Sequence, residues 1–91
     1  MARKKEVLFK SEEHTSRARA AAFLRELAEK IESGRVVLQQ GSREVPVEVG
    51  DAVELEVSFD LKEKKRGTRR KLEVELEWYD GDASTGPVQL G

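Results

Sequence analysis

Residues 71–78, Lys-Leu-Glu-Val-Glu-Leu-Glu-Trp, alternate charged and apolar side chains without a break and end in the only tryptophan. Successive side chains of a β-strand point to opposite faces of the sheet. The stretch therefore predicts an amphipathic strand with an apolar row on one face, Leu72, Val74, Leu76 and Trp78, and an acidic row on the other, Glu73, Glu75 and Glu77. We expect the apolar row to be buried and the acidic row to stay in water.

Length and composition limit the functions that such a strand can serve. A chain of 91 residues is one domain, large enough for its own core but too small to add a deep substrate cavity. The 38% of charged residues nearly cancel to a net charge of -1, so any electrostatic function must be local. With no cysteine, thiolate metal sites and cysteine nucleophiles are excluded. We expect no enzymatic activity and no cofactor.

The amino-terminal residues bear on where the protein resides. Met-Ala-Arg-Lys-Lys resembles the beginning of a signal peptide, but Glu6, Lys10, Glu12 and Glu13 leave no apolar region after it. No apolar run is long enough to span a bilayer. These features predict a cytoplasmic protein without a membrane partner.

A helix is predicted over residues 17–33. One stripe of apolar side chains recurs at helical spacing, namely Ala20, Phe23, Leu24, Leu27, Ala28 and Ile31. Thr15 or Ser16 can cap the free amides at its start, and Gly34 can adopt the left-handed conformation that ends it.

Two strands, residues 35–40 and 43–49, flank a Gly41-Ser42 turn that suits a two-residue hairpin. Counting outward from the turn places apolar residues opposite apolar ones and opposite charges together, in the pairs Leu38 with Val45, Val36 with Val47, Gln39 with Glu44, and Arg35 with Glu48. The same count places Pro46 opposite Val37, so the outer side of this strand is an edge or is weakly paired.

A second amphipathic strand is predicted from Val53 to Leu61, and residues 62–70 are predicted to be a cationic connection to the 71–78 strand. Residues 6–10 predict a short first strand whose neighbour is undetermined. Residues 1–79 then form a single α+β domain, and residues 80–91, rich in Gly, Ser, Thr and Asp, predict a disordered tail.

Several blocks in a fixed order carry a resemblance to a known family. They are Val7-Leu8-Phe9-Lys10, residues 20–28 (Ala-Ala-Ala-Phe-Leu-Arg-Glu-Leu-Ala), residues 34–39 (Gly-Arg-Val-Val-Leu-Gln) and residues 72–78. Together they resemble the amphi-Trp domain family, small proteins of uncharacterised function that are frequent in halophilic archaea. The resemblance covers roughly residues 5–79 and implies a compact helix-plus-sheet unit whose defining strand ends in Trp78. It implies no activity or ligand.

The fold class predicted from these elements is α+β, with one amphipathic helix packed on one face of a mostly antiparallel sheet of four or five strands. On the wet face of that sheet, at least one of Glu54 and Glu56 must lie opposite or beside Glu73, Glu75 or Glu77. Facing like charges cost about 0.2 to 1 kcal/mol per pair. Interleaved Lys or Arg, a docked basic partner or second copy of the chain, or a divalent cation can each offset this cost.

A basic cluster stands next to this acidic face in the sequence. It comprises Lys62, Lys64, Lys65, Arg66, Arg69, Arg70 and Lys71. Its cations either keep a hairpin tip soluble or form a loop that binds nucleic-acid phosphates. Without interleaved aromatic residues to stack on bases, such binding has poor specificity.

Catalytic constellations are missing from the sequence. His14 is the only histidine, and Ser11, Ser16 and Ser42 have no partner base in the pattern, so they are interpreted as loop, capping or turn residues. The sequence predicts a non-enzymatic binding or protein-interaction module that uses the charged sheet face, with weak nucleic-acid binding through residues 62–71 as the alternative.

Overall fold

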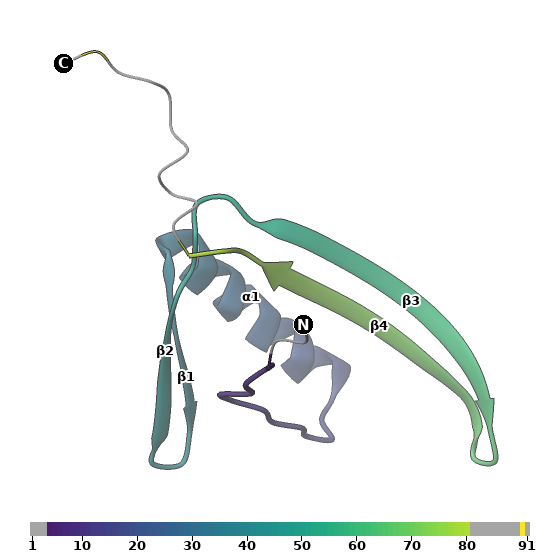
Figure 1. Cartoon of the computed structure of the whole chain (residues 1–91). Coiled ribbons are helices and arrows are strands. Elements are labelled where there is room, and N and C mark those ends of the chain that lie inside the picture. Colours follow the sequence, from purple (N-terminus) through teal and green to yellow (C-terminus); the bar gives the residue numbers. More distant parts are fainter. Residues whose placement is uncertain (1–3, 81–89, 91) are drawn as a thin grey trace. The chain divides into compact units, whose positions relative to one another are not determined.

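A computed structural model describes residues 4–80 and residue 90. The described chain contains one helix and four strands in the order α1, β1, β2, β3, β4 (Figure 1). It divides after Val49 into an amino-terminal unit, which holds α1, β1 and β2, and a hairpin unit, which holds β3 and β4. The predicted α+β class is confirmed. The expected tail lies mostly outside the described residues.

Helix α1 spans Arg17–Ser33, as the apolar stripe predicted. Ser16 caps its first turn, because the Ser16 side chain accepts a hydrogen bond from the Arg19 amide at 3.1 Å. Gly34 ends the helix with φ 90, and its amide donates to the Ile31 carbonyl at 2.9 Å. Glycine reaches this left-handed conformation without steric cost, which explains the sharp stop.

The core of the amino-terminal unit lies where α1 contacts β1 (Arg35–Gln40). Val36 on β1 is buried, with 8% of its surface exposed, and it is the one buried residue in the described part of the chain. Leu27 and Ile31 on the helix are half-buried. The amide of Val49 donates to the Gly34 carbonyl at 2.9 Å, which joins the end of the hairpin to the end of the helix.

Strands β1 and β2 (Arg43–Glu48) form the predicted hairpin around Gly41, whose φ of 60 suits the tight turn. The predicted register is confirmed pair for pair, including Val37 opposite Pro46. Charged and polar partners form hydrogen bonds across the ladder as expected. Arg35 Nη1 donates to Glu48 Oε1 at 2.9 Å, and Gln39 Nε2 donates to Glu44 Oε1 at 2.9 Å.

The first strand expected at residues 6–10 is not formed, because these residues have no regular secondary structure. A side chain holds them instead of a backbone ladder: the Arg43 guanidinium donates to the Leu8 carbonyl and lies 6.0 Å from the centre of the Phe9 ring. A short apolar run between charges does not specify a strand partner, and here polar side-chain contacts with β2 replace strand pairing.

Strands β3 (Glu54–Lys64) and β4 (Gly67–Glu77) pair antiparallel over eleven residues each and form a long curved hairpin (Figure 1). The cationic connection expected at residues 62–70 is therefore wrong in extent, since the turn itself is only Lys65-Arg66. Most of the basic residues belong to the ladder. Backbone pairing continues past the apolar rows because the cross-strand hydrogen bonds join backbone amides to backbone carbonyls, whichever side chains the paired residues carry.

The strands form two separate two-stranded sheets, β1 with β2 and β3 with β4, and not the single sheet of four or five strands that we expected. Alternation of side chains specifies the faces of a strand but not the neighbour along each edge. Local pairing across two short turns accounts for both ladders. The packing of α1 on one face of a larger sheet stays a prediction.

The apolar row of the hairpin is exposed, contrary to the expected burial. Five of its side chains show 60 to 69% exposure, namely Leu55, Val57, Phe59, Leu72 and Val74. An isolated two-stranded hairpin has no second layer with which to cover its apolar face. The exception is the base of the hairpin, the end where β3 begins and β4 ends, because Leu76 and Trp78 are half-buried there.

Trp78 packs against the residue where the hairpin unit begins. A Cβ atom placed on Gly50 lies 3.2 Å from Cδ1 of the Trp78 indole and 3.4 Å from its Cγ. The close approach leaves no room for a side chain at position 50 without displacing the indole. Tryptophan thus closes the base of the hairpin against a glycine.

Candidate interaction surface

The polar face of the hairpin carries its acidic residues at the base. Glu54 lies directly opposite Glu77, and Glu56 lies opposite Glu75. We call Glu54, Glu56, Glu73, Glu75 and Glu77 the acidic half. The expected meeting of like charges is therefore confirmed, as two cross-strand pairs.

Two cations neutralise part of this face. Lys71 Nζ lies 3.1 Å from Glu73 Oε1, and Arg69 Nη2 lies 3.0 Å from Asp60 Oδ1. Within residues 50–80, no ion pair reaches the other four glutamates of the acidic half, Glu54, Glu56, Glu75 and Glu77. Interleaving of Lys or Arg along the hairpin thus explains Glu73 but not the two like-charge pairs.

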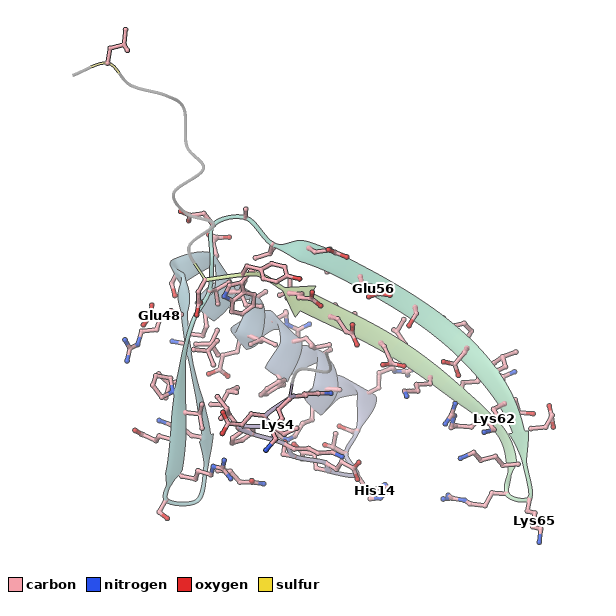
Figure 2. The ribbon with its side chains drawn as sticks, in the orientation of Figure 1. Lys4, His14, Glu48, Glu56, Lys62 and Lys65 are labelled. Atoms are coloured by element: carbon pink, nitrogen blue, oxygen red, sulfur yellow. The ribbon has the colours of Figure 1, made fainter. Side chains whose placement is uncertain are left out.

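The same face changes sign toward the turn. Lys62 pairs with Arg69, and Asp60 pairs with Lys71. We call Lys62, Lys64, Arg69 and Lys71 the basic half. Figure 2 shows Glu56 well back along β3 and Lys62 and Lys65 close to the turn. Charge is therefore separated along the length of one sheet face.

The remaining cations of the predicted phosphate-binding cluster lie elsewhere. Lys65 and Arg66 form the turn, and Arg70 pairs with Leu61 on the apolar face. A shallow depression of about 400 Å³ at the turn is lined by Lys64, Arg66, Gly67, Thr68 and Arg69. The seven cations are thus distributed over both faces and the turn.

The amino-terminal unit contains an open groove of about 850 Å³ between α1 and β1. Phe23, Leu27 and Leu38 line it together with charged side chains such as Glu26 and Lys30. His14 is exposed in the segment before α1. No group of three or more His, Asp or Glu residues that could hold a metal occurs in the described residues.

Sequence reasoning identified the members of the hairpin surface but not their arrangement. It missed Asp60, which holds Arg69, and it missed the separation of the face into acidic and basic halves. The sequence does contain the information needed to predict the two halves. If β3 is extended to Lys64, the order of its charged residues shows that the base of the polar face is acidic and the end near the turn is basic.

These features define a small α+β protein whose closing strand alternates apolar and acidic residues and is followed directly by a tryptophan at the base of a hairpin. The model of the Amphi-Trp domain matches residues 1–90, nearly the whole chain. The protein belongs to the Amphi-Trp family.

Comparison with curated proteins and with solved structures found no match to this chain. No helix among the described residues is long and apolar enough to cross a membrane.

Proposed function

We propose that this protein is a non-enzymatic interaction module that binds a basic protein surface through the acidic half of the β3–β4 hairpin. One observation carries the proposal: Glu54 opposite Glu77 and Glu56 opposite Glu75 are like-charge pairs that no cation bridges within residues 50–80. Each pair costs about 0.2 to 1 kcal/mol in the free chain, and a basic partner relieves that cost on binding.

The geometry of the acidic half suits a protein partner better than a metal ion. Carboxylates two residues apart on a strand are about 7 Å apart, so a cation can be bridged only by two glutamates that lie directly opposite each other, which is fewer ligands than calcium requires. A calcium site also needs carbonyl oxygens from a loop, whereas these glutamates lie on a regular ladder. Lys or Arg side chains of a partner are long enough to reach each carboxylate separately.

The rest of the chain supplies the support for this surface. We propose that the apolar stripe of α1 packs on one face of an antiparallel sheet, in keeping with the exposure of Phe23 and Leu24 at 50% and 58%. We propose the cytoplasm as the compartment, because a chain without cysteine needs no oxidising environment.

Charge reversal on β4 tests the binding surface. Replacing Glu73, Glu75 and Glu77 by lysine is expected to weaken binding of a short oligolysine peptide by about tenfold, because about 1.4 kcal/mol of attraction is lost. Isothermal titration at low salt measures the affinity, and amide shifts in NMR spectra locate the bound peptide.

The matched control places the same charge change on the helix. Glu26, Glu29 and Glu32 on α1 are exposed, and their replacement by lysine alters net charge equally. We expect this variant to lose much less affinity. Equal losses in the two variants would show that net charge alone attracts the peptide, which contradicts a specific acidic surface.

A second candidate function rests on the concentration of cations at the turn. We propose weak, sequence-nonspecific binding of nucleic acid by Lys62, Lys64, Lys65, Arg66, Arg69, Arg70 and Lys71 as the alternative, supported by the depression that five residues line there. Binding to single-stranded RNA is expected to fall steeply with salt in a fluorescence anisotropy titration. Tight binding at high salt would contradict this mechanism.

A further inference from the structure

Strand β3 has an edge that is unusually open to pairing. It runs for eleven residues, contains no proline and keeps an unbroken register with β4, its one partner in its sheet. Every residue of β3 is exposed. At each second position a strand directs its amide and carbonyl away from its partner, so an edge of this length is a template for another strand.

The charges on the polar face of β3 are self-complementary. Its base carries Glu54 and Glu56, and its tip carries Lys62 and Lys64. None of these four side chains makes an ion pair within residues 50–80. An antiparallel strand of the same sequence presents its lysines to these glutamates and its glutamates to these lysines.

We propose that the basic surface recognised by the acidic half is the basic half of a second copy of this chain, with the two β3 strands pairing antiparallel. Phe59 lies on the two-fold axis, Glu56 lies opposite Lys62 of the second copy, and Glu54 lies opposite its Lys64. The inference rests on the proposed interaction function and names its partner.

The charges select one register. A shift by two residues in one direction places Glu56 opposite Asp60 of the second copy, and the opposite shift places Asp60 opposite itself. Each shift keeps only two of the four attractive contacts, Glu54 with Lys62 in the first case and Glu56 with Lys64 in the second, and it adds repulsion between like charges. A shift by one residue turns the apolar row of one copy to the polar face of the other. In the favoured register Val57 faces Leu61 of the second copy on the apolar side.

The edge of β4 is a weaker site for a second copy. Its cations are already engaged, Lys71 with Glu73 and Arg69 with Asp60. Within the ladder its apolar row is also shorter, from Leu72 to Leu76, because Arg70 lies opposite Leu61, whereas the row on β3 runs from Leu55 to Leu61. Pairing through β3 therefore satisfies free charges and joins apolar surface to apolar surface.

The paired hairpins form a four-stranded antiparallel sheet with two strands from each copy. One face of this sheet carries the apolar rows of both copies, which meet around Phe59 and are flanked by Glu63 and Arg70 toward each turn, and the other has an acidic half beside each basic half. A sheet of this size offers a helix a continuous apolar surface, which a single two-stranded hairpin lacks.

Two single substitutions, Glu56→Lys and Lys62→Glu, test the pairing. Within one chain each replaces a like-charge pair by an opposite-charge pair, at Glu56 with Glu75 or at Lys62 with Arg69, so each favours folding of the hairpin. Between copies each creates two like-charge contacts. We expect each variant to raise the dissociation constant of the wild-type dimer about tenfold, measured by sedimentation equilibrium.

Mixing the variants supplies the specific readout. In a mixed pair the lysine introduced by Glu56→Lys meets the glutamate introduced by Lys62→Glu, and the unchanged Glu56 of the second variant meets the unchanged Lys62 of the first. Both contacts are attractive. An equimolar mixture is therefore expected to regain a dissociation constant near that of the wild type, as is the double substitution Glu56→Lys with Lys62→Glu in one chain.

The outcomes separate this inference from the proposed function. A wild-type chain that stays monomeric, or a dimer that neither reversal weakens and mixing does not restore, overturns pairing through β3. If the monomer still binds oligolysine through Glu73, Glu75 and Glu77, the acidic surface stands and its partner is another protein. Loss of both behaviours overturns the proposed function itself.

Discussion

Replacing Phe59 by alanine is expected to lower the free energy of unfolding by about 3 kcal/mol, the cost of removing a buried aromatic side chain. Phe59 is 61% exposed on the hairpin. If it keeps that exposure in solution, its removal costs a few tenths of a kcal/mol, as for most surface positions. The large effect is expected because the apolar stripe of α1, packed as proposed on the four-stranded sheet, covers the apolar face around Phe59. Urea denaturation followed by circular dichroism measures the difference.

Tyr79 provides the matched control for Phe59. It is also aromatic and is 72% exposed, but it lies beyond the end of β4 and outside the proposed pairing. Its replacement by alanine is expected to cost less than about 0.5 kcal/mol.

Protein concentration distinguishes what covers Phe59. Coverage by a second copy makes the denaturation midpoint rise with concentration, since association stabilises the folded chain by mass action. Coverage within one chain leaves the midpoint constant. A loss below about 0.5 kcal/mol for Phe59→Ala at every concentration would show that this side chain is not covered at all.

Local rules predicted the elements whose signals lie within a few residues. Ser16 and Gly34 bound α1 because one hydroxyl and one left-handed residue satisfy the free backbone groups of the helix ends. The β1–β2 register follows from a two-residue turn and from the match of facing side chains such as Leu38 and Val45.

The prediction of β3 and β4 stopped too early because it followed apolar alternation alone. Residues 62–64 and 67–70 carry mostly charges, and such a run is typical of a loop. Backbone pairing nonetheless continues to Lys64 and Gly67, since lysine and arginine tolerate a strand whose two faces are both in water. To predict where a strand ends within a charged stretch, one must know which strand pairs with it.

The sequence does not reveal which strand lies along each edge of a predicted strand. Alternation at a period of two states which side chains share a face but says nothing about which strand lies alongside. Residues 6–10 illustrate the limit: their apolar run predicted a strand, yet the contacts with Arg43 hold Leu8 and Phe9 without a ladder. The like-charge pairs were predictable because any sensible hairpin register brings Glu56 to the β4 glutamates.

Val36 and Val37 are neighbours on β1 that should respond very differently to truncation. Val36 is 8% exposed where α1 contacts β1, and Val37 is 39% exposed on the opposite face. Val36→Ala is expected to lower the free energy of unfolding by about 2 kcal/mol, which combines lost burial of two methyl groups with the cavity left behind. Val37→Ala is expected to cost about 0.5 kcal/mol. Because both variants remove the same two methyl groups from the same strand, the difference between them in urea denaturation reports mainly the burial of Val36 under the helix. Equal losses would mean that α1 does not cover β1 in solution, and the half-buried Leu27 and Ile31 would then need another partner.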